Sequence, residues 1–349
     1  MPMERLIARL ASEHKLDDSQ MGELLQSAAQ NLNVLQLLRT TAVRTAREQF
    51  GLGIYIRGLV ELSSYCHQDC LYCGLRRSNS SAERYRLSHD EVMECAKEGY
   101  RLGFRTIVLQ GGEDGTHSDK WLVELISDIR NNYPDVAITL SLGERSRDSY
   151  SRLFEAGANR YLLRHEAANS ALYESLHPTG RGLEHRLKCA QALKELGFQL
   201  GMGMMIGVKG QRIEDIVSDL QLVQQMDCQM VGIGPFLPHH ATPLGTEPAG
   251  DLNLTLAAVA IARLLLPKAL IPSTTALATL TPRGRLEGIL SGANVVMPNL
   301  SPSDVRAKYA IYENKASWGK EAAEGLKALN EELQTIGYHI DYSRGDYKN

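Results

Sequence analysis

The sequence predicts an α/β protein, specifically a complete TIM-type (β/α)8 barrel. From Tyr55 onward, short β-rich apolar runs alternate with longer amphipathic stretches, as is typical of repeated βα units around a parallel sheet. Eight such alternations span roughly 250 residues, the usual size of this barrel. The chain has 349 residues and is 43% hydrophobic, enough for one large core. A doubly wound open sheet shares the alternation and remains an alternative.

Three segments make up the chain. Residues 1–50 predict an N-terminal helical lead-in, because the apolar residues of ERLIARLASEH recur at helical spacing. Residues 51–301 are the barrel, and residues 302–349 are a C-terminal helical extension packed on it. The eight expected strands cover residues 54–63, 106–110, 137–142, 160–164, 201–207, 230–234, 270–274 and 294–298.

Amphipathic segments between these strands predict the helices. The first runs from Ser88 to Gly103, with a serine N-cap, an acidic first turn and a terminal glycine. The others cover residues 118–133, 146–157, 182–197, 213–226 and 253–266. Catalytic groups of such a barrel lie on the loops that follow the strands.

The charge balance favours a small-molecule partner. Thirty-eight basic and 41 acidic side chains give a net charge of −3, so no overall field attracts nucleic acid or an anionic membrane. No apolar run approaches the roughly 18 residues of a membrane span, and the start MPMERLIARL lacks the apolar centre of a secretory signal. We therefore expect a cytoplasmic protein.

A cysteine motif follows the first expected strand. In CHQDCLYC, Cys66, Cys70 and Cys73 have C-x3-C-x2-C spacing. Three thiolates hold three irons of a [4Fe-4S] cluster and leave the fourth iron to a small chelating molecule. A zinc site completed by His67 and three unliganded thiols are the alternatives. The isolated cysteines predict packed thiols; they are Cys95, Cys189 and Cys228.

Two further patterns suit an amino acid ligand. In LQGGEDG, glycines let the backbone approach a ligand and Glu113 supplies a carboxylate; the alternative is a surface turn with a solvated glutamate. Arg164 and Glu166 share one face of an extended backbone, and Arg186 adds a second guanidinium suited to a carboxylate. For these three residues, surface ion pairing is the alternative.

Polar residues also occupy strand positions that are usually apolar, among them Thr139 and Ser141. Buried charge is costly without a partner, so we expect Arg57 and Arg160 to line a deep pocket for an anionic substrate. Outward pairing with acids such as Glu61 is the alternative. Met205 is expected to fill the core. The adjacent histidines His239 and His240 are expected to be solvated rather than metal-bound.

The cysteine motif, with the aromatic Tyr72 before its last cysteine, resembles the radical SAM superfamily. This resemblance implies that S-adenosylmethionine (SAM) chelates the open iron and that reductive cleavage yields a 5′-deoxyadenosyl radical. The GGE turn resembles the family's methionine-binding turn, which places Glu113 near the SAM ammonium group.

Longer stretches resemble the HydE family, the radical SAM maturases that help assemble the H-cluster of FeFe-hydrogenase. The resemblance runs from about Tyr55 to Tyr312 and is carried by YCHQDCLYCGLRRSN, ERYRLSHDEV, TIVLQGGED, ITLSLGE, RYLLRHE, VGIGPFLPH, TPL and ANVVMPNLSP. It implies a monomeric enzyme, a cysteine-bound iron carbonyl cyanide substrate inside the barrel, the partner maturases HydG and HydF, and an electron donor such as ferredoxin or flavodoxin.

The resemblance also implies roles for individual residues. The cluster ligands are Cys66, Cys70 and Cys73. The implied cofactor shell is Tyr72, Gln110, Gly112, Glu113, Thr139, Ser141, Arg164, Glu166, Arg186 and Met205. The implied substrate and catalytic residues are Arg57, Arg160, Thr274, Thr275, Met297, Tyr309 and Tyr312. For the two tyrosines, ordinary amphipathic packing is the alternative, because YAIY has helical spacing.

No cysteine follows Cys228, so we expect no second cluster of the kind that some HydE sequences carry near the C-terminus. Methylornithine synthase, a lysine mutase with the same cluster spacing, is the nearest rival. Biotin synthase is more distant, since it needs additional cysteines. A non-catalytic iron–sulfur carrier is the alternative outside the enzymes; it predicts no SAM cleavage and gives the GGED and RHE segments no role.

Overall fold

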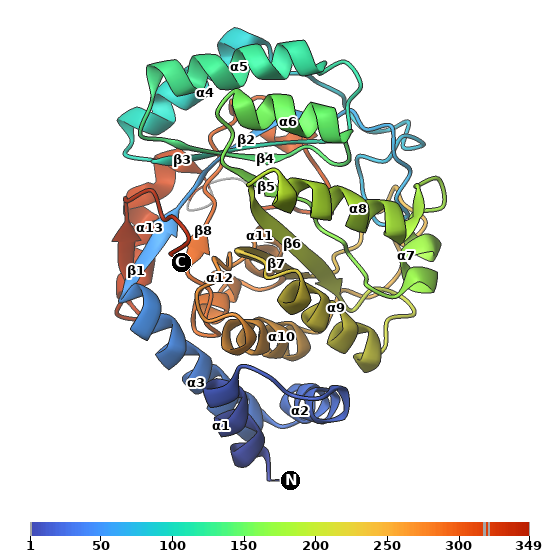
Figure 1. The fold of residues 1–349 in the computed structure, drawn as a ribbon, viewed down its shortest axis with the longest axis vertical. Helices are drawn as coiled ribbons and strands as arrows, with labels where there is room; N and C mark the ends of the chain where they lie inside the picture. The colour runs from blue at the N-terminus through green and yellow to red at the C-terminus, as the bar shows by residue number, and fades with distance from the viewer. Residues whose placement is uncertain (1, 317–318, 320–321, 349) are drawn as a thin grey trace.

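The computed structural model describes residues 2–316, 319 and 322–348 and contains two parallel sheets (Figure 1). The six-stranded sheet has the order β2-β3-β4-β5-β6-β7. Its strands are β2 (Gly58–Ser63), β3 (Thr106–Gly111), β4 (Ala137–Ser141), β5 (Arg160–Leu162), β6 (Gln199–Ile206) and β7 (Met230–Pro235). The three-stranded sheet, of order β8-β1-β9, consists of β1 (Gly53–Ile56), β8 (Val295–Val296) and β9 (His339–Asp341).

The first expected strand is divided at Arg57, so that β1 and β2 belong to different sheets. Single bridges link the two sheets: Met230 pairs with Leu270, Pro272 with Val295, and Leu59 with Asn299. The expected strand 270–274 is present only as these bridges. Pro272 lacks a backbone N–H, which limits the ladder that this segment forms.

The helical lead-in consists of α1 (Met3–Glu13), α2 (Asp18–Gln30) and α3 (Leu32–Phe50). These helices pack against α10 (Leu252–Leu265), which in turn contacts β7 (Figure 1). Because α10 is covered on both sides, all its residues from Thr255 to Leu265 are buried, which explains why its sequence is apolar all round.

Local capping sets the start of several outer helices. Ser88 and Glu91 form a capping box at α4 (His89–Arg101), and serines 118 and 146 cap the next two helices. The remaining helices of this region are α5 (Asp119–Asn132), α6 (Arg147–Glu155), α7 (Ser170–Leu176), α8 (Gly182–Glu195), α9 (Ile213–Gln225), α11 (Thr275–Leu280) and α12 (Gly284–Ile289). Among the described residues, none of these helices combines the length and apolarity that crossing a bilayer requires.

The described part of the C-terminal extension contains more than helices. It forms the 3-10 turns η1 (Arg306–Lys308) and η3 (Ala323–Gly325), the helix α13 (Leu326–Gln334) and the strand β9. The strand β9 was not predicted. It pairs with β1 from Gly53 to Tyr55 and so joins the C-terminal extension to the three-stranded sheet.

The position of Arg160 corrects one expectation. Arg160 is fully buried, but it is the first residue of β5, and it donates to the first residues of β3 and β6, Thr106 and Gln199. Its remaining donors reach the carbonyls of residues 344 and 345 and, at 2.7 Å, the carboxylate of Asp346. The prediction that Arg160 lines the substrate pocket is therefore wrong: it lies at the N-terminal strand ends and anchors the C-terminal tail, which the strand period alone did not indicate.

Candidate active site

The three clustered cysteines lie in the loop after β2. Their thiols are free and partly buried. Burial raises the pKa of Cys73 to about 12. Burial also raises the pKa of Cys70, and the neighbouring charges of Cys73 and Cys66 raise it further. Three thiolates this close to one another need a cation to compensate their charge, so the donor set fits an iron–sulfur cluster.

The cysteine loop is held by polar contacts to its own backbone. Asp69 is buried and accepts hydrogen bonds from Arg76 Nε at 2.8 Å and from the backbone N–H of Ser78 at 3.1 Å. The bond from Arg76 holds the pKa of Asp69 well below its usual range. Arg84 donates to the Leu75 carbonyl at 2.9 Å. These contacts hold the loop without using the cysteine thiols.

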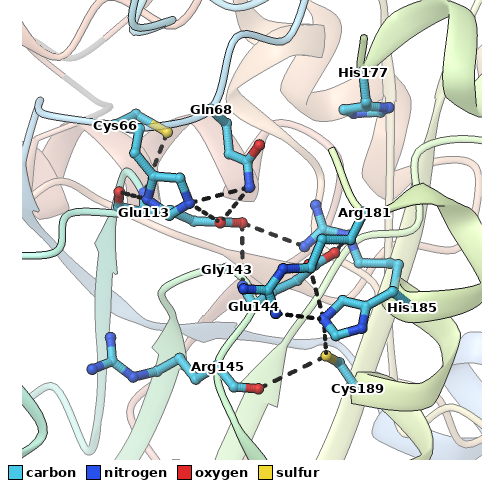
Figure 2. Close-up of polar contacts among 12 residues, drawn as sticks. Cys66, Gln68, Glu113, Gly143, Glu144, Arg145, His177, Arg181, His185 and Cys189 are labelled. Atoms are coloured by element: carbon cyan, nitrogen blue, oxygen red, sulfur yellow. Dashed lines mark hydrogen bonds and ion pairs between the residues drawn. The ribbon is translucent and has the colours of Figure 1, made fainter. Parts of the chain in front are cut away.

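The GGE turn packs directly on this loop. A Cβ on Gly112 would lie 2.2 Å from the Tyr65 carbonyl oxygen and 2.8 Å from Cys66 Cβ, so only glycine fits. The Glu113 N–H donates to Cys66 Sγ at 3.3 Å. The Glu113 carboxylate accepts from Gln68 Nε2 at 2.7 Å (Figure 2) and its side chain is only 10% exposed. The alternative of a solvated surface glutamate is wrong.

The guanidinium groups of Arg164 and Arg186 lie beside the cysteine loop and the GGE turn. Arg164 contacts Glu166 at 3.0 Å and donates to the Met204 carbonyl, while its buried Nε has no hydrogen-bond partner among the described residues. Glu166 has φ 61, a left-handed conformation that costs a non-glycine residue energy and is common at functional sites. Arg186 lies 3.7 Å from Glu113, and its buried Nε and Nη1 form no hydrogen bonds to the described chain.

These groups line one pocket at the C-terminal ends of the strands. The predicted residues that line it are Cys66, Cys70, Gly112, Glu113, Ser141, Arg164, Glu166 and Arg186. Carboxylates and guanidinium groups, some of whose nitrogens form no hydrogen bond to described residues, lie beside Cys66 and Cys70. This combination suits an amino acid zwitterion that also reaches a metal. Residues that the sequence did not single out also line it: Gln68, Glu144, Tyr173 and His177.

One of these additional residues, His177, orients Tyr72. The Tyr72 hydroxyl lies 2.9 Å from His177 Nε2, and His177 Nδ1 lies 2.7 Å from the Tyr173 carbonyl oxygen. Because a carbonyl only accepts, Nδ1 carries the proton and Nε2 accepts from Tyr72. Burial lowers the pKa of His177 to about 4, so this neutral tautomer persists. Nothing in the sequence LHPTG indicated this pair.

Other buried polar groups do not line this pocket. Arg57 is buried, and burial, followed by the charge of Arg160, lowers its pKa well below the usual value. Its Nη1 contacts Met230 Sδ at 3.2 Å, while Nε and Nη2 have no partner in the described chain. The hydroxyls of Thr139 and Thr274 are likewise buried without hydrogen bonds to described residues. Buried donors of this kind fit an anion or polar ligand.

The suggested outward partner of Arg57 is engaged elsewhere. Glu61 is fully buried and contacts Lys315 Nζ at 2.6 Å and Asn299 Nδ2 at 2.9 Å. A pair between Arg57 and Glu61 is therefore not formed. Near Glu61, the Gln110 amide donates to the Tyr309 hydroxyl at 3.3 Å, which joins a predicted cofactor residue to a predicted substrate residue.

The remaining predicted residues have varied surroundings. Tyr309 is buried and follows the short turn η1, and Tyr312 lies in a bend, so the YAIY spacing does not reflect an α-helix. Met205 is buried in a cluster that includes Tyr72. Thr275 is the first residue of α11, and Met297 packs on an apolar cluster around Tyr55 and Met230.

The chain is similar to proteins of known family. Residues 60–223 match the model of the Radical SAM superfamily. The chain is 46% identical over 269 residues to the "[FeFe] hydrogenase maturase subunit HydE" of Thermotoga maritima, covering 77% of this chain and 76% of that protein.

More distant relatives extend over nearly the whole chain. The chain is 28% identical to the 3-methylornithine synthase of Methanosarcina acetivorans, over 96% of this chain and 93% of that protein. The crystal structure of methylornithine synthase (PylB) superimposes with a TM-score of 0.85 at 26% identity, covering 96% of this chain and 97% of that one. The cysteine motif, the pocket and the 46% identity together show that this chain belongs to the radical SAM superfamily, as a member of the HydE family of hydrogenase maturases.

Proposed function

We propose that the chain holds a [4Fe-4S] cluster on Cys66, Cys70 and Cys73 and binds SAM in the adjoining pocket. The observation that carries the proposal is the convergence of Cys66, Cys70, Glu113, Glu166 and Arg186 on one pocket. The bound cluster and SAM would supply one-electron reductive cleavage of a sulfonium carbon–sulfur bond. No second cluster is part of the proposal.

The protein's own groups bind and orient the cofactor. Glu113 and Glu166 present carboxylates to an ammonium group, and Arg186 offers Nη1, which has no hydrogen bond to described residues, to a carboxylate. Tyr72, held by His177, and Met205 form an apolar and aromatic wall for the adenosine. Gln110, Thr139 and Ser141 complete the proposed shell along strands β3 and β4.

We further propose that the strands form a complete eight-membered ring. Support comes from the bridges at Leu270, Pro272 and Asn299, which lie between β7 and β2. Closure would leave the interior reachable only from the strand ends and would keep water from a reactive radical. The segment that carries Tyr309, Tyr312 and Lys315 would cover this interior beside β2.

The proposed substrate is a small, anionic, sulfur-containing precursor, namely a cysteine-bound iron carbonyl cyanide species. The relative at 46% identity is named as a hydrogenase maturase, and the buried Arg57 donors without partners in the described chain suit cyanide or carboxylate. Thr274, Thr275, Met297, Tyr309 and Tyr312 would line the rest of the site. HydG and HydF as partners, a ferredoxin or flavodoxin as electron donor, and a monomeric state complete the proposal.

A lysine mutase of the methylornithine synthase type is the second candidate, supported by the match over nearly the full length of both chains. One experiment distinguishes the maturase function from the lysine mutase function. Anaerobic, reduced enzyme is mixed with SAM and either L-lysine or a synthetic cysteine-bound iron carbonyl cyanide complex. We expect only the iron complex to be consumed and to raise SAM turnover. Methylornithine formation would favour the mutase, and intact SAM in all mixtures would leave only an iron–sulfur carrier.

A further inference from the structure

A second group of metal-ligating side chains lies beside the proposed SAM pocket. Glu144 follows β4, and His185 and Cys189 lie one turn apart on α8, on the same face of the helix. Their ligand atoms all lie within 4.8 Å of one another. Figure 2 shows the three side chains meeting between the loop after β4 and α8. None of the three belongs to the cysteine motif.

Two of the three separations match the edges of a tetrahedral metal site, and the third, between Glu144 and Cys189, is no more than 4.8 Å. Glu144 Oε2 lies 3.4 Å from His185 Nε2, which lies 3.6 Å from Cys189 Sγ. Zinc bonds of about 2.0–2.1 Å to nitrogen or oxygen and about 2.3 Å to sulfur place tetrahedral ligands about 3.3 Å apart for N and O and about 3.6 Å apart for N and S. The three atoms are therefore close enough to ligate one ion together.

Burial makes this arrangement more than a surface cluster. The Glu144 side chain is 8% exposed and Cys189 is 6% exposed, whereas His185 is 32% exposed and leaves a path for an ion. A glutamate, a thiolate and a neutral imidazole carry two negative charges, which a divalent cation neutralises.

Two arginines adjoin the group, and both are compatible with an ion. Arg186 Nε lies 3.4 Å from Oε1 of Glu144, the oxygen not used above. Arg181 Nη1 lies 3.3 Å from His185 Nε2 (Figure 2). Arg181 is exposed, so its side chain can turn into solvent when the imidazole lone pair binds a metal.

The other trio of potential ligands fits less well. His239 and His240 are adjacent in the chain, and their rings stack with centroids 4.6 Å apart. His240 Nδ1 already contacts the Glu313 carboxylate at 2.5 Å. Stacked rings direct their lone pairs side by side rather than toward one point, so this group does not converge on an ion.

We propose that Glu144, His185 and Cys189 bind one divalent metal ion of the zinc type, separate from the iron–sulfur cluster. The ion would take its fourth ligand from water and would tie the loop after β4 to α8. It would also fix the carboxylate that contacts Arg186 and so stabilise one wall of the neighbouring pocket.

The test uses cluster-loaded protein under anaerobic conditions. The protein is incubated with one equivalent of Zn²⁺ and desalted, its zinc and iron are counted, and the zinc K-edge X-ray absorption spectrum, which does not detect iron, is recorded. We expect about one zinc per chain, unchanged iron, one sulfur neighbour at about 2.3 Å and nitrogen or oxygen neighbours at about 2.0–2.1 Å. Cys189→Ser and His185→Phe should lose the zinc, and the matched buried cysteine variant Cys228→Ser should keep it.

Three results would overturn the proposal. The unaltered protein could retain no zinc, or Cys189→Ser and His185→Phe could retain as much zinc as the unaltered protein. The zinc could also have several sulfur neighbours, which would indicate that it is bound in the cysteine motif. The iron content and thermal midpoint of each variant report whether it is folded. If Cys189→Ser is unfolded, His185→Phe and Glu144→Gln give the same comparison.

Discussion

Lys315, from the C-terminal extension, reaches the fully buried carboxylate of Glu61 on β2, with Nζ 2.6 Å from Oε1. Both side chains are almost excluded from solvent, at 7% and 0% exposure. The extension is therefore joined to the sheet through charge as well as through apolar contacts, and the Tyr309 hydroxyl accepts a hydrogen bond from Gln110 on the neighbouring strand β3.

Removing Lys315 should destabilise the protein strongly. Lys315→Met leaves the Glu61 carboxylate buried without its cation, and breaking such a pair costs about 3–5 kcal/mol. The free energy of unfolding from denaturant titration measures this loss. Lys97→Met, which breaks the exposed pair with Glu94, is the control and should cost no more than about 1 kcal/mol. If Lys315→Met and Lys97→Met lowered the free energy of unfolding equally, Lys315 and Glu61 would not form a stabilising buried ion pair.

Gly112→Ala should abolish cluster assembly. The added methyl group would lie 2.2 Å from the Tyr65 carbonyl oxygen, so the backbone beside Cys66 has to move. Gly115→Ala is the matched control, because no heavy atom lies within 4 Å of its added Cβ. Iron per chain after anaerobic reconstitution is the measurement. Full iron content in Gly112→Ala would show that the turn does not shape the cysteine loop.

Arg57 and Arg160, two of the buried arginines, should respond in opposite ways to substitution. Arg160→Met removes a paired group that anchors the tail, and it should lower the thermal midpoint without changing SAM affinity. Arg57→Met removes a buried charge that forms no ion pair within the described chain. It should raise the free energy of unfolding, because burying an unpaired charge is costly, and it should abolish turnover of the iron substrate. A lower free energy of unfolding in Arg57→Met would contradict the proposal that Arg57 is held unpaired for an anionic substrate.

Acid should weaken the Tyr72–His177 pair. The pKa of His177 is lowered to about 4 in the folded protein, whereas an unfolded histidine titrates near 6.5. The neutral ring therefore contributes its full stability above about pH 6.5, and that contribution falls as the pH drops toward 4. The variant His177→Gln is the control, because the amide side chain keeps a donor and an acceptor but does not titrate.

The measurement is the free energy of unfolding of both proteins between pH 7.5 and pH 5. The stability of the unaltered protein relative to His177→Gln should decrease by up to about 1.4 kcal/mol for each pH unit below 6.5. A difference that does not change with pH would mean that His177 is not held neutral.

Short sequence motifs predicted several residues that line the pocket. They did not predict contacts between residues that are far apart in the sequence. The spacing of Cys66, Cys70 and Cys73 and the glycine turn at Gly112 depend on residues close in sequence. The structure brings Cys66, Cys70 and Gly112 together in one pocket, and Cys73 lies near enough to Cys70 for its charge to raise the pKa of Cys70. The strand period predicted that Arg160 is buried, but the period does not specify toward which strand end a long side chain extends. Its partner Asp346 lies 186 residues away.

The sequence also did not indicate the pocket residues His177 and Glu144, because their contacts depend on the folded chain. His177 and Glu144 lie in irregular segments between elements, where no periodicity fixes side-chain direction. The strand β9 is three residues long and forms only because β1 offers it a free edge. Such elements depend on the assembled sheet rather than on the local sequence.

The central claim is that the protein supplies three ligands to a four-iron cluster and leaves one iron for SAM. Mössbauer spectroscopy of ⁵⁷Fe-reconstituted protein, recorded with and without SAM, tests this claim most directly. We expect one of the four irons to change its isomer shift when SAM is added, while the other three do not. A spectrum that is identical with and without SAM, with all four irons equivalent, would contradict the claim.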